Sequence, residues 1–232
     1  MDASKNDIIA NQVFLGVPWK KARKYEGIVN TLNKKFPLSF VIVGRGDNQD
    51  AEDLLQVIKN KIDASSYAIF DATRGNANVS LEFGYAEALD IPRVLYLSTH
   101  KATAKGTRES AIIADLAGKR RNNYTNENKL EELLRGFSKG HSYTIKFERF
   151  LNIGFKRSSK GEKKRSRALA LKIIHELDNQ RQVRRADIVQ RLQADPASYK
   201  NNEIDDMIKM LHKEKLIRSQ QGPHSRVHVA YE

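Results

Sequence analysis

Two carboxylates in one short stretch of the sequence could do chemistry. The stretch FDATRGNANVSLEFGYA spans residues 70–86 and contains Asp71 and Glu82. Asp71 directly follows the apolar run YAIF, and Glu82 lies in a segment with helical spacing of apolar residues. An ionised carboxylate can stabilise a positive charge that develops in a transition state, or it can act as a nucleophile. We therefore treat Asp71 and Glu82 as candidate catalytic residues.

Both acids also have ordinary structural interpretations. Asp71 could cap the turn after its strand, and Glu82 could be a solvated residue on a half-exposed helix. The neighbours of Glu82 on one side of the helix are apolar, since they are Val79, Phe83 and Ala86. The place of each side chain in the fold decides between these alternatives.

The elements that position these acids alternate along the first part of the sequence. Apolar runs that end at turn residues predict strands at residues 11–17, 39–44, 66–72 and 92–98. Apolar residues at helical spacing predict helices at residues 23–36, 50–62 and 78–90. Unbroken apolar strands that alternate with helices indicate a parallel sheet covered on both faces. The expected fold is α/β, with a flavodoxin- or Rossmann-like sheet of about four or five strands.

Ligands of such sheets bind beyond the carboxyl ends of the strands. Asp71 falls at one strand end, Gly16 at another, and Glu82 lies early in the helix after the third strand. We expect Asp71 and Glu82 to line one cleft, with residues 16–19 on its rim. A position near the helix N-terminus would favour the ionised form of Glu82.

Three further side chains could complete this cleft. Asn78 and Tyr85 lie about one turn before and after Glu82 on the predicted helix, so they could orient its carboxylate. Trp19 is the single tryptophan of the chain, and it could stack on a base or simply pack in the core.

The last third of the sequence has a different pattern. Helical spacing predicts helices at residues 167–177, 184–193 and 201–215, and two strands follow at residues 216–220 and 226–231. Three helices before a β-hairpin are typical of a winged helix. We expect a first domain at 1–140, a connecting segment with a basic linker at 141–165, and a winged-helix domain at 166–232.

Positive charge is concentrated in the second part. The chain has a net charge of +13, and residues 156–191 hold 12 basic and 4 acidic side chains. This excess indicates contact with nucleic acid or another polyanion, although a solvated basic surface would have the same composition. The candidate contacts are Lys163, Lys164, Arg165, Arg184 and Arg185. The third predicted helix opens with Glu203, Asp205 and Asp206, which would repel phosphates, so we do not expect it to read bases.

The segment IFDATRGNANVSLEFGYAEALDIPRVLYL, residues 69–97, resembles the central motif of nucleoside 2-deoxyribosyltransferase-like proteins and of the related bacterial TIR-like proteins. In that motif an acid ends a strand, and Asn-Val-x-x-Glu-x-Gly-x-Ala opens a helix after a loop. The run VFLGVPW at residues 13–19 is similar to the first strand of the family and the turn after it. The run IIADLAGKRRNNY at residues 112–124 resembles a late segment of the TIR-like branch.

The resemblance implies cleavage or transfer at the N-glycosidic bond of a nucleoside, a nucleotide or NAD. Glu82 would be the nucleophile or the stabiliser of an oxocarbenium-like sugar, and Asp71 would contact the nucleoside. The resemblance implies a homo-oligomer with no cofactor, and NAD would enter only as a substrate. The joining of such a domain to a winged helix resembles the effectors of some retron-type antiphage systems. Substrate-binding residues implied by the motif are Gly16, Val17, Trp19, Asn78 and Tyr85.

The composition limits which disulfides, metal sites and membrane segments the chain could have. The sequence has no cysteine, which excludes disulfides and thiolate metal sites, and its six histidines lack metal-ligand spacing. We find no apolar run of the ~20 residues that span a bilayer and no secretory signal, and we expect a cytoplasmic protein without membrane or metal. Two alternatives to the enzyme stay open: a nucleotide sensor that regulates transcription without turnover, and an assembly module with neither activity.

Overall fold

The chain divides into two compact units. The first comprises Met1–Leu32 and Phe40–Ser138 with the terminal Glu232, and the second comprises Asn33–Ser39 and Lys139–Tyr231. The computed structural model describes residues 8–43, 51–100, 114–177, 183–219 and 226–229.

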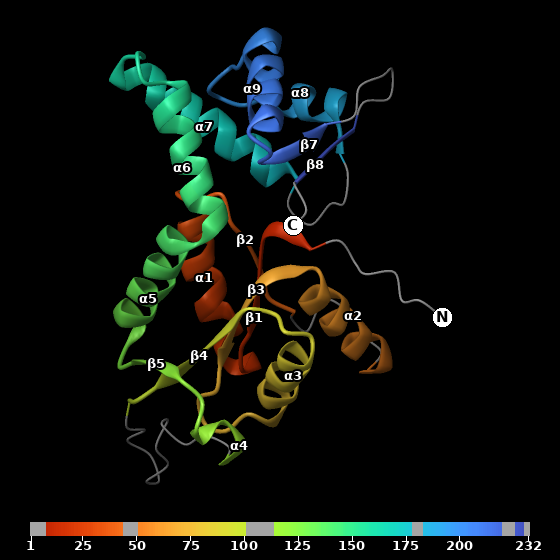
Figure 1. Ribbon diagram of the computed structural model, residues 1–232, viewed down its shortest axis with the longest axis vertical. Helices are drawn as coiled ribbons and strands as arrows, with labels where there is room; N and C mark the ends of the chain where they lie inside the picture. Colours follow the sequence, from red (N-terminus) through yellow and green to blue (C-terminus); the bar gives the residue numbers. More distant parts are fainter. Residues whose placement is uncertain (1–7, 44–50, 101–113, 178–182, 220–225, 230–232) are drawn as a thin grey trace. The chain divides into compact units, whose positions relative to one another are not determined.

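A five-stranded sheet forms the centre of the first unit, with the strand order β2-β1-β3-β4-β5 (Figure 1). The pairs β1–β3, β3–β4 and β4–β5 are parallel. This order is flavodoxin-like, and its topological switch point lies between β1 and β3. The predicted α/β, Rossmann-like fold class is therefore confirmed. The strands are β1 (Ile9–Gly16), β2 (Ser39–Val41), β3 (Ser65–Asp71), β4 (Arg93–Ser98) and β5 (Arg121–Tyr124).

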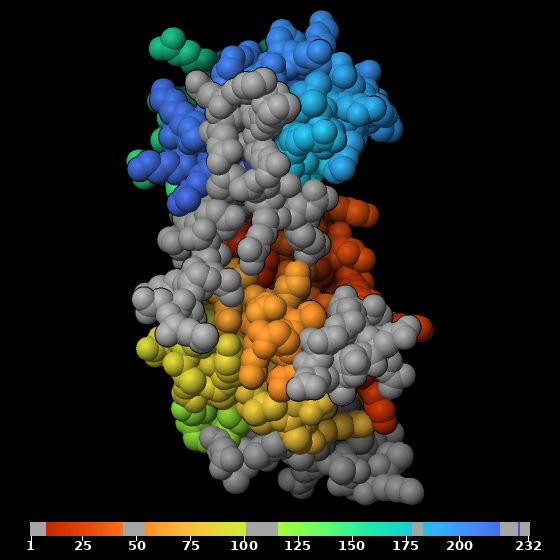
Figure 2. Space-filling view, turned by 90° about the vertical axis from the view of Figure 1, so that its right-hand side faces the viewer, coloured from red at the N-terminus to blue at the C-terminus, as the bar shows by residue number. Residues whose placement is uncertain are grey.

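Helices cover both faces of this sheet. Figure 1 shows α1 (Ala22–Asn33) and α5 (Glu127–Gly140) on one side, and α2 (Ala51–Asp63) and α3 (Ala77–Ala88) on the other. Figure 2 views the side on which α2 and α3 lie, and there these two helices form much of the surface of the unit. Two short elements complete it, the 3₁₀ helix η1 (Trp19–Lys21) and α4 (Ala114–Ala117).

Three phenylalanines fix α3 against the switch point. Phe14 of β1 and Phe70 of β3 have ring centroids 5.9 Å apart, and Phe83 of α3 meets Phe70 edge-on at 5.5 Å. All three belong to one buried apolar cluster. Because Phe83 is locked against the sheet, its neighbour Glu82 is held close to the end of β1.

The second unit contains four helices and a small antiparallel sheet of order β6-β8-β7 among its described residues. The predicted order of three helices and then two strands is present, with the short β6 added before the second of these helices. The turn predicted between the last two strands lies outside the described residues. The elements are α6 (Ser142–Gly154), α7 (Lys160–Glu176), β6 (Val183–Arg184), α8 (Arg185–Gln193), α9 (Asn201–Lys213), β7 (Ile217–Ser219) and β8 (Arg226–Val229).

The range 141–165, which was predicted as a connecting segment with a basic linker, is largely helical. That range contains all of α6 and the first turns of α7, separated by a short turn. Lys, Arg and Glu are good helix formers, so a charged run is compatible with a helix, and a capping box starts α7 at Ser159 and Glu162. Across the described residues we find no helix that combines the length and the apolar character needed to cross a membrane.

Candidate active site

Asp71 lies at the end of β3, and its side chain is fully buried. Its Oδ2 accepts hydrogen bonds from the Tyr124 hydroxyl at 2.7 Å and the Tyr25 hydroxyl at 3.1 Å. Lys21 Nζ lies 3.4 Å from the same oxygen. Oδ1 accepts from the backbone N–H of Thr73 at 3.0 Å and from the Thr73 hydroxyl. Both oxygens are thus satisfied from within the protein.

Four different segments bring these donors together. Tyr25 belongs to α1, Tyr124 ends β5, Lys21 ends η1, and Thr73 lies in the turn after β3. Burial raises the pKa of both tyrosines, and the neighbouring Asp71 raises each pKa further. Their hydroxyls therefore stay protonated and act as donors at neutral pH. Asp71 combines the turn-capping role with that of an anchor for Lys21.

Glu82 is the sixth residue of α3, and its carboxylate faces the end of β1. A Cβ built on Gly16 would lie 2.6 Å from Glu82 Oε2 and would also collide with the Phe70 ring. In the described part of the chain no hydrogen-bond partner reaches the buried Oε2. The glutamate is therefore packed closely against a strand end rather than solvated on its helix.

Burial raises the pKa of Glu82 from 4.5 to about 7. We had expected the helix N-terminus to keep this group ionised. The helix dipole acts mainly on the first turn, whereas Glu82 lies in the second, so the loss of solvation prevails. A carboxyl group that titrates near neutrality and lacks a partner is typical of a functional position.

A cleft of about 600 Å³ opens at the carboxyl end of the sheet. Its lining residues come from two segments, one after β1 and one after β3: Pro18, Trp19, Lys20, Lys21, Thr73, Arg74, Asn76 and Asn78. A second cleft of about 450 Å³ shares Lys21 with the first and is lined mainly by polar residues on the β4 and β5 side. Lys21 therefore lies at the boundary between the two clefts.

The structure brings some of the sequence-predicted residues to this cleft and places others elsewhere. Trp19, which is 40% exposed, and Asn78 line it directly. Gly16 lies beside Glu82. Glu82 follows Asn78 by one helical turn on α3. Val17 is buried in the core.

Three expectations need correction. Glu82 was expected to line the cleft, but it is not among the residues that line it, whereas Asn78, one turn earlier on α3, is. The carboxylate of Asp71 lies beneath Lys21 and Thr73 and has no exposed surface, so it does not line the cleft. The hydroxyl of Tyr85 donates to Asp63 at the end of α2, at 2.9 Å, so this side chain turns away from Glu82. The reason is packing, because α3 lies against α2 on that side.

Several residues of the site were not predicted, and four of them carry no obvious functional signal. Tyr25, Thr73, Arg74 and Tyr124 hold Asp71 or line the cleft, and each looks ordinary in the sequence. Thr73 alone has a local signal, because a Thr two residues after an Asp is a common partner in a turn. Arg74 has a left-handed φ of 64°, which is uncommon for a residue other than glycine.

The basic residues predicted to contact nucleic acid divide into two groups. Lys163 and Lys164 are exposed on the first turns of α7. The three arginines instead pair with acids: Arg165 with Glu203 at 3.0 Å, Arg184 with Asp187 at 3.0 Å, and Arg185 with Asp205 at 2.8 Å. Two of the acids that open α9 are therefore neutralised within the unit.

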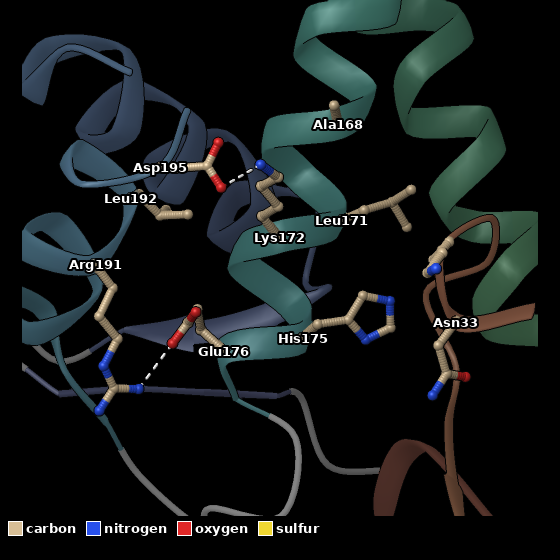
Figure 3. Close-up of a pocket in the computed structure, with 10 residues that line it drawn as sticks. Asn33, Ala168, Leu171, Lys172, His175, Glu176, Arg191, Leu192 and Asp195 are labelled. Atoms are coloured by element: carbon tan, nitrogen blue, oxygen red, sulfur yellow. Dashed lines mark hydrogen bonds and ion pairs between the residues drawn. The ribbon is translucent and has the colours of Figure 1, made fainter. Parts of the chain in front are cut away.

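A separate pocket of about 480 Å³ lies in the second unit, along α7 and α8 (Figure 3). Four of its charged side chains form two ion pairs, Lys172 with Asp195, and Arg191 with Glu176 at 2.8 Å, and Lys34 also lines it. Figure 3 shows Leu171 and Leu192 among these pairs. The four charges of these pairs compensate each other. Among the described residues no cluster of His, Asp and Glu could hold a metal ion.

No protein-family model matches the sequence, and no curated protein sequence is significantly similar to it. Among solved structures, the chain is similar to a 2-desoxiribosyltransferase from Leishmania mexicana. The TM-score is 0.43 and the identity is 15%, over 56% of this chain and 99% of that chain. At this level the similarity assigns neither a substrate nor site residues to this protein.

Proposed function

We propose that the first unit cleaves the N-glycosidic bond of a nucleoside-type substrate, with Glu82 as the carboxylate that meets the sugar. The observation that carries the proposal is the buried Oε2 of Glu82, which has no hydrogen-bond partner among the described residues and lies at the β1–β3 switch point. Unsatisfied buried polar groups are costly, and a bound substrate can supply the missing partner.

The chemistry fits this carboxyl group. C1′ of the sugar becomes cationic as the base departs, so an ionised Glu82 would stabilise the transition state more than the ground state. It could also form a covalent glycosyl intermediate, as carboxylates do in retaining glycosidases. Because burial raises the pKa of Glu82 to about 7, the group can exchange a proton near neutral pH.

The surroundings of Glu82 supply the other parts of such a site. Trp19 offers an exposed aromatic face for a base, and Asn78 offers an amide on the same cleft. In this proposal Asp71 acts as a positioning residue, because it holds Lys21 and Thr73 at the cleft rather than touching the substrate. Hydrolysis and transfer to a second acceptor share these first steps.

The test is incubation with a panel of nucleosides, nucleotides and NAD, followed by chromatography for released base. We expect release by the wild type and a loss of at least about 100-fold with Glu82→Gln, since one electrostatic stabiliser is worth about 3–4 kcal/mol. The matched control is Glu87→Gln on the same helix, because Glu87 pairs with Arg93 and Lys119 on the surface. Equal activity of the two variants would reject the role of Glu82.

Binding of a panel compound without release of any base would favour the nucleotide-sensor alternative. That outcome would support the cleft as a ligand-binding site and reject the proposed enzymatic activity. Absence of both binding and release would favour an assembly module.

We also propose that the second unit is a winged helix that binds nucleic acid through the start of α7. The specific observation is a run of exposed cations there, Lys156, Arg157, Lys160, Lys163 and Lys164, with Glu162 as the single acid among residues 156–164. Phosphate contacts of this kind give affinity without sequence preference.

A further inference from the structure

The cleft beside Glu82 carries positive charge on two sides. Lys20 and Lys21 approach from η1, and Arg74 approaches from the turn after β3. None of the described residues that line this cleft is acidic. Three cations therefore stand on the cleft that Trp19 and Asn78 also line, and one of them, Lys21, is paired with Asp71 beneath it.

The ammonium group of Lys21 is held in place at this cleft. It donates to the Tyr124 hydroxyl at 2.8 Å and lies 3.4 Å from Asp71 Oδ2. These partners are themselves buried. A cation with a fixed position loses less side-chain entropy when an anion binds, so it is a better anion-binding group than a mobile surface lysine.

The turn that presents Arg74 has an unusual backbone. Arg74 has a φ of 64° and Gly75 follows with a φ of 60°. A left-handed φ costs a residue with a side chain about 1 kcal/mol or more, and such conformations cluster at ligand sites. The planar guanidinium of arginine suits bidentate contact with phosphoryl oxygens. An anion with several oxygens fits this combination better than a single carboxylate.

We propose that Lys20, Lys21 and Arg74 form a subsite for a phosphoryl group, so that the substrate or ligand class is a 5′-phosphorylated nucleotide rather than a free nucleoside. The assignment of a nucleoside moiety rests on the proposed function. The phosphoryl subsite rests on the cations of the cleft. Neither Glu82 nor Asp71 would touch the phosphate, because neither carboxylate lines the cleft surface.

The test compares binding of the common nucleosides, their 5′-monophosphates and inorganic phosphate by calorimetry. The protein is Glu82→Gln, so that turnover does not interfere. We expect at least one 5′-monophosphate to bind about tenfold or more tightly than its nucleoside. The double variant Lys20→Gln/Arg74→Gly, in the same background, should remove that preference while the nucleoside still binds. Glycine is chosen at position 74 because it adopts the left-handed φ without strain.

The matched control is Lys129→Gln/Arg135→Gln, which removes two cations from exposed or half-exposed pairs on α5. It should keep the preference for the phosphorylated ligand. The subsite is rejected if no monophosphate binds more tightly than its nucleoside, or if the double variant and the control behave alike. Binding of phosphate alone with no gain for any nucleotide also rejects it, as an adventitious anion site.

The binding and base-release measurements together test this inference independently of the proposed function. A phosphate-dependent gain in affinity without base release by the wild type would support the subsite and reject the glycosidase. Base release at equal rates from nucleosides and nucleotides would support the glycosidase and reject the subsite.

Discussion

The two glutamates of α3 show how burial decides the behaviour of a residue. Glu82 packs against Gly16 and Phe70, and burial raises its pKa to about 7. Glu87 is more exposed and pairs with Arg93 and Lys119, and these cations lower its pKa. The two side chains are five residues apart on one helix, yet their pKa values are shifted in opposite directions.

The first prediction concerns Glu82 and the pH dependence of stability. Between pH 4.5 and 7 the carboxyl ionises in the unfolded chain but stays protonated in the folded one, so the folded state loses stability as pH rises. One pKa unit corresponds to about 1.4 kcal/mol, so this loss is at most about 3.5 kcal/mol and is complete above pH 7. Urea unfolding at several pH values should show this slope in the wild type and not in Glu82→Gln.

The variant Glu87→Gln is the control for that experiment. The lowered pKa of Glu87 stabilises the folded state above its unfolded pKa, and this contribution disappears as pH falls. Its removal should leave the loss between pH 4.5 and 7 in place. A wild type without that loss would mean that Glu82 is solvated in solution.

The second prediction concerns the close contact at Gly16. Alanine there would force Phe70 and the Glu82 carboxylate to move, because the added Cβ has no room. We expect Gly16→Ala to lower the free energy of unfolding by about 1–3 kcal/mol and to reduce base release. Gly84→Ala is the matched control, since an added Cβ at Gly84 meets nothing within 4 Å and alanine favours a helix. Chemical unfolding and the chromatographic assay would measure both effects, and a fully active, stable Gly16→Ala would contradict the packing.

At the scale of elements, the start of α7 shows how local capping overrides a linker-like composition. Ser159 accepts from the backbone N–H of Glu162, and the Glu162 carboxylate accepts from the backbone N–H of Ser159 at 2.7 Å. Beyond the cap, the inner face of α7 is buried through Leu169, Ile173 and Ile174. The charged first turns are therefore the solvated end of a helix that is fixed by its apolar second half.

The third prediction tests this cap. Ser159→Ala should lower the stability of the second unit by about 1 kcal/mol, because one orphan N–H of α7 loses its partner. Ser158→Ala, one residue earlier and outside the cap, should have little effect. Urea midpoints followed by circular dichroism at 222 nm provide the measurement. Equal midpoints for the two variants would place the start of the helix elsewhere.

At the scale of the whole molecule, the basic residues fall into two groups, those that pair with acids and those that are exposed to solvent. Arg165 binds Glu203 and stacks on Tyr199 at 4.7 Å, so its charge serves the packing of the second unit. Lys163 and Lys164 are solvent exposed on α7. Among these residues, the two lysines are the better candidates for contacts with a polyanion.

The fourth prediction follows from this division. In the chain with both units, Lys163→Gln/Lys164→Gln should reduce the slope of log affinity for DNA against log salt by up to about 2 units. Arg165→Gln should leave the slope nearly unchanged and lower thermal stability, because Glu203 and the carbonyl of Ala197 lose their partner. Fluorescence anisotropy with DNA of random sequence measures the slopes. Absence of binding at low salt would mean that the basic run is only a solvated surface.

Much of the first unit could be predicted from local pattern. The spacing of apolar residues gave the helices within a few residues of their bounds, and apolar runs that end at turn residues gave four of the five strands. The apolar flanks of Glu82 indicated its burial, and Asp71 was placed at its strand end. These features depend on residues that are close in sequence. The spacing of apolar residues and the positions of turn residues indicate such local structure directly.

The composition of the site was decided by the tertiary structure. Tyr25, Lys21 and Tyr124 reach Asp71 from 46, 50 and 53 residues away along the chain. Their convergence requires the strand order β2-β1-β3-β4-β5, which places the ends of β1 and β3 side by side and β5 two strands from β3. A periodic pattern fixes which face of an element is buried but not which distant element covers it. The sequence therefore determined that an acid stands at the carboxyl end of β3, and only the folded chain made that acid the buried anchor of a cationic cleft.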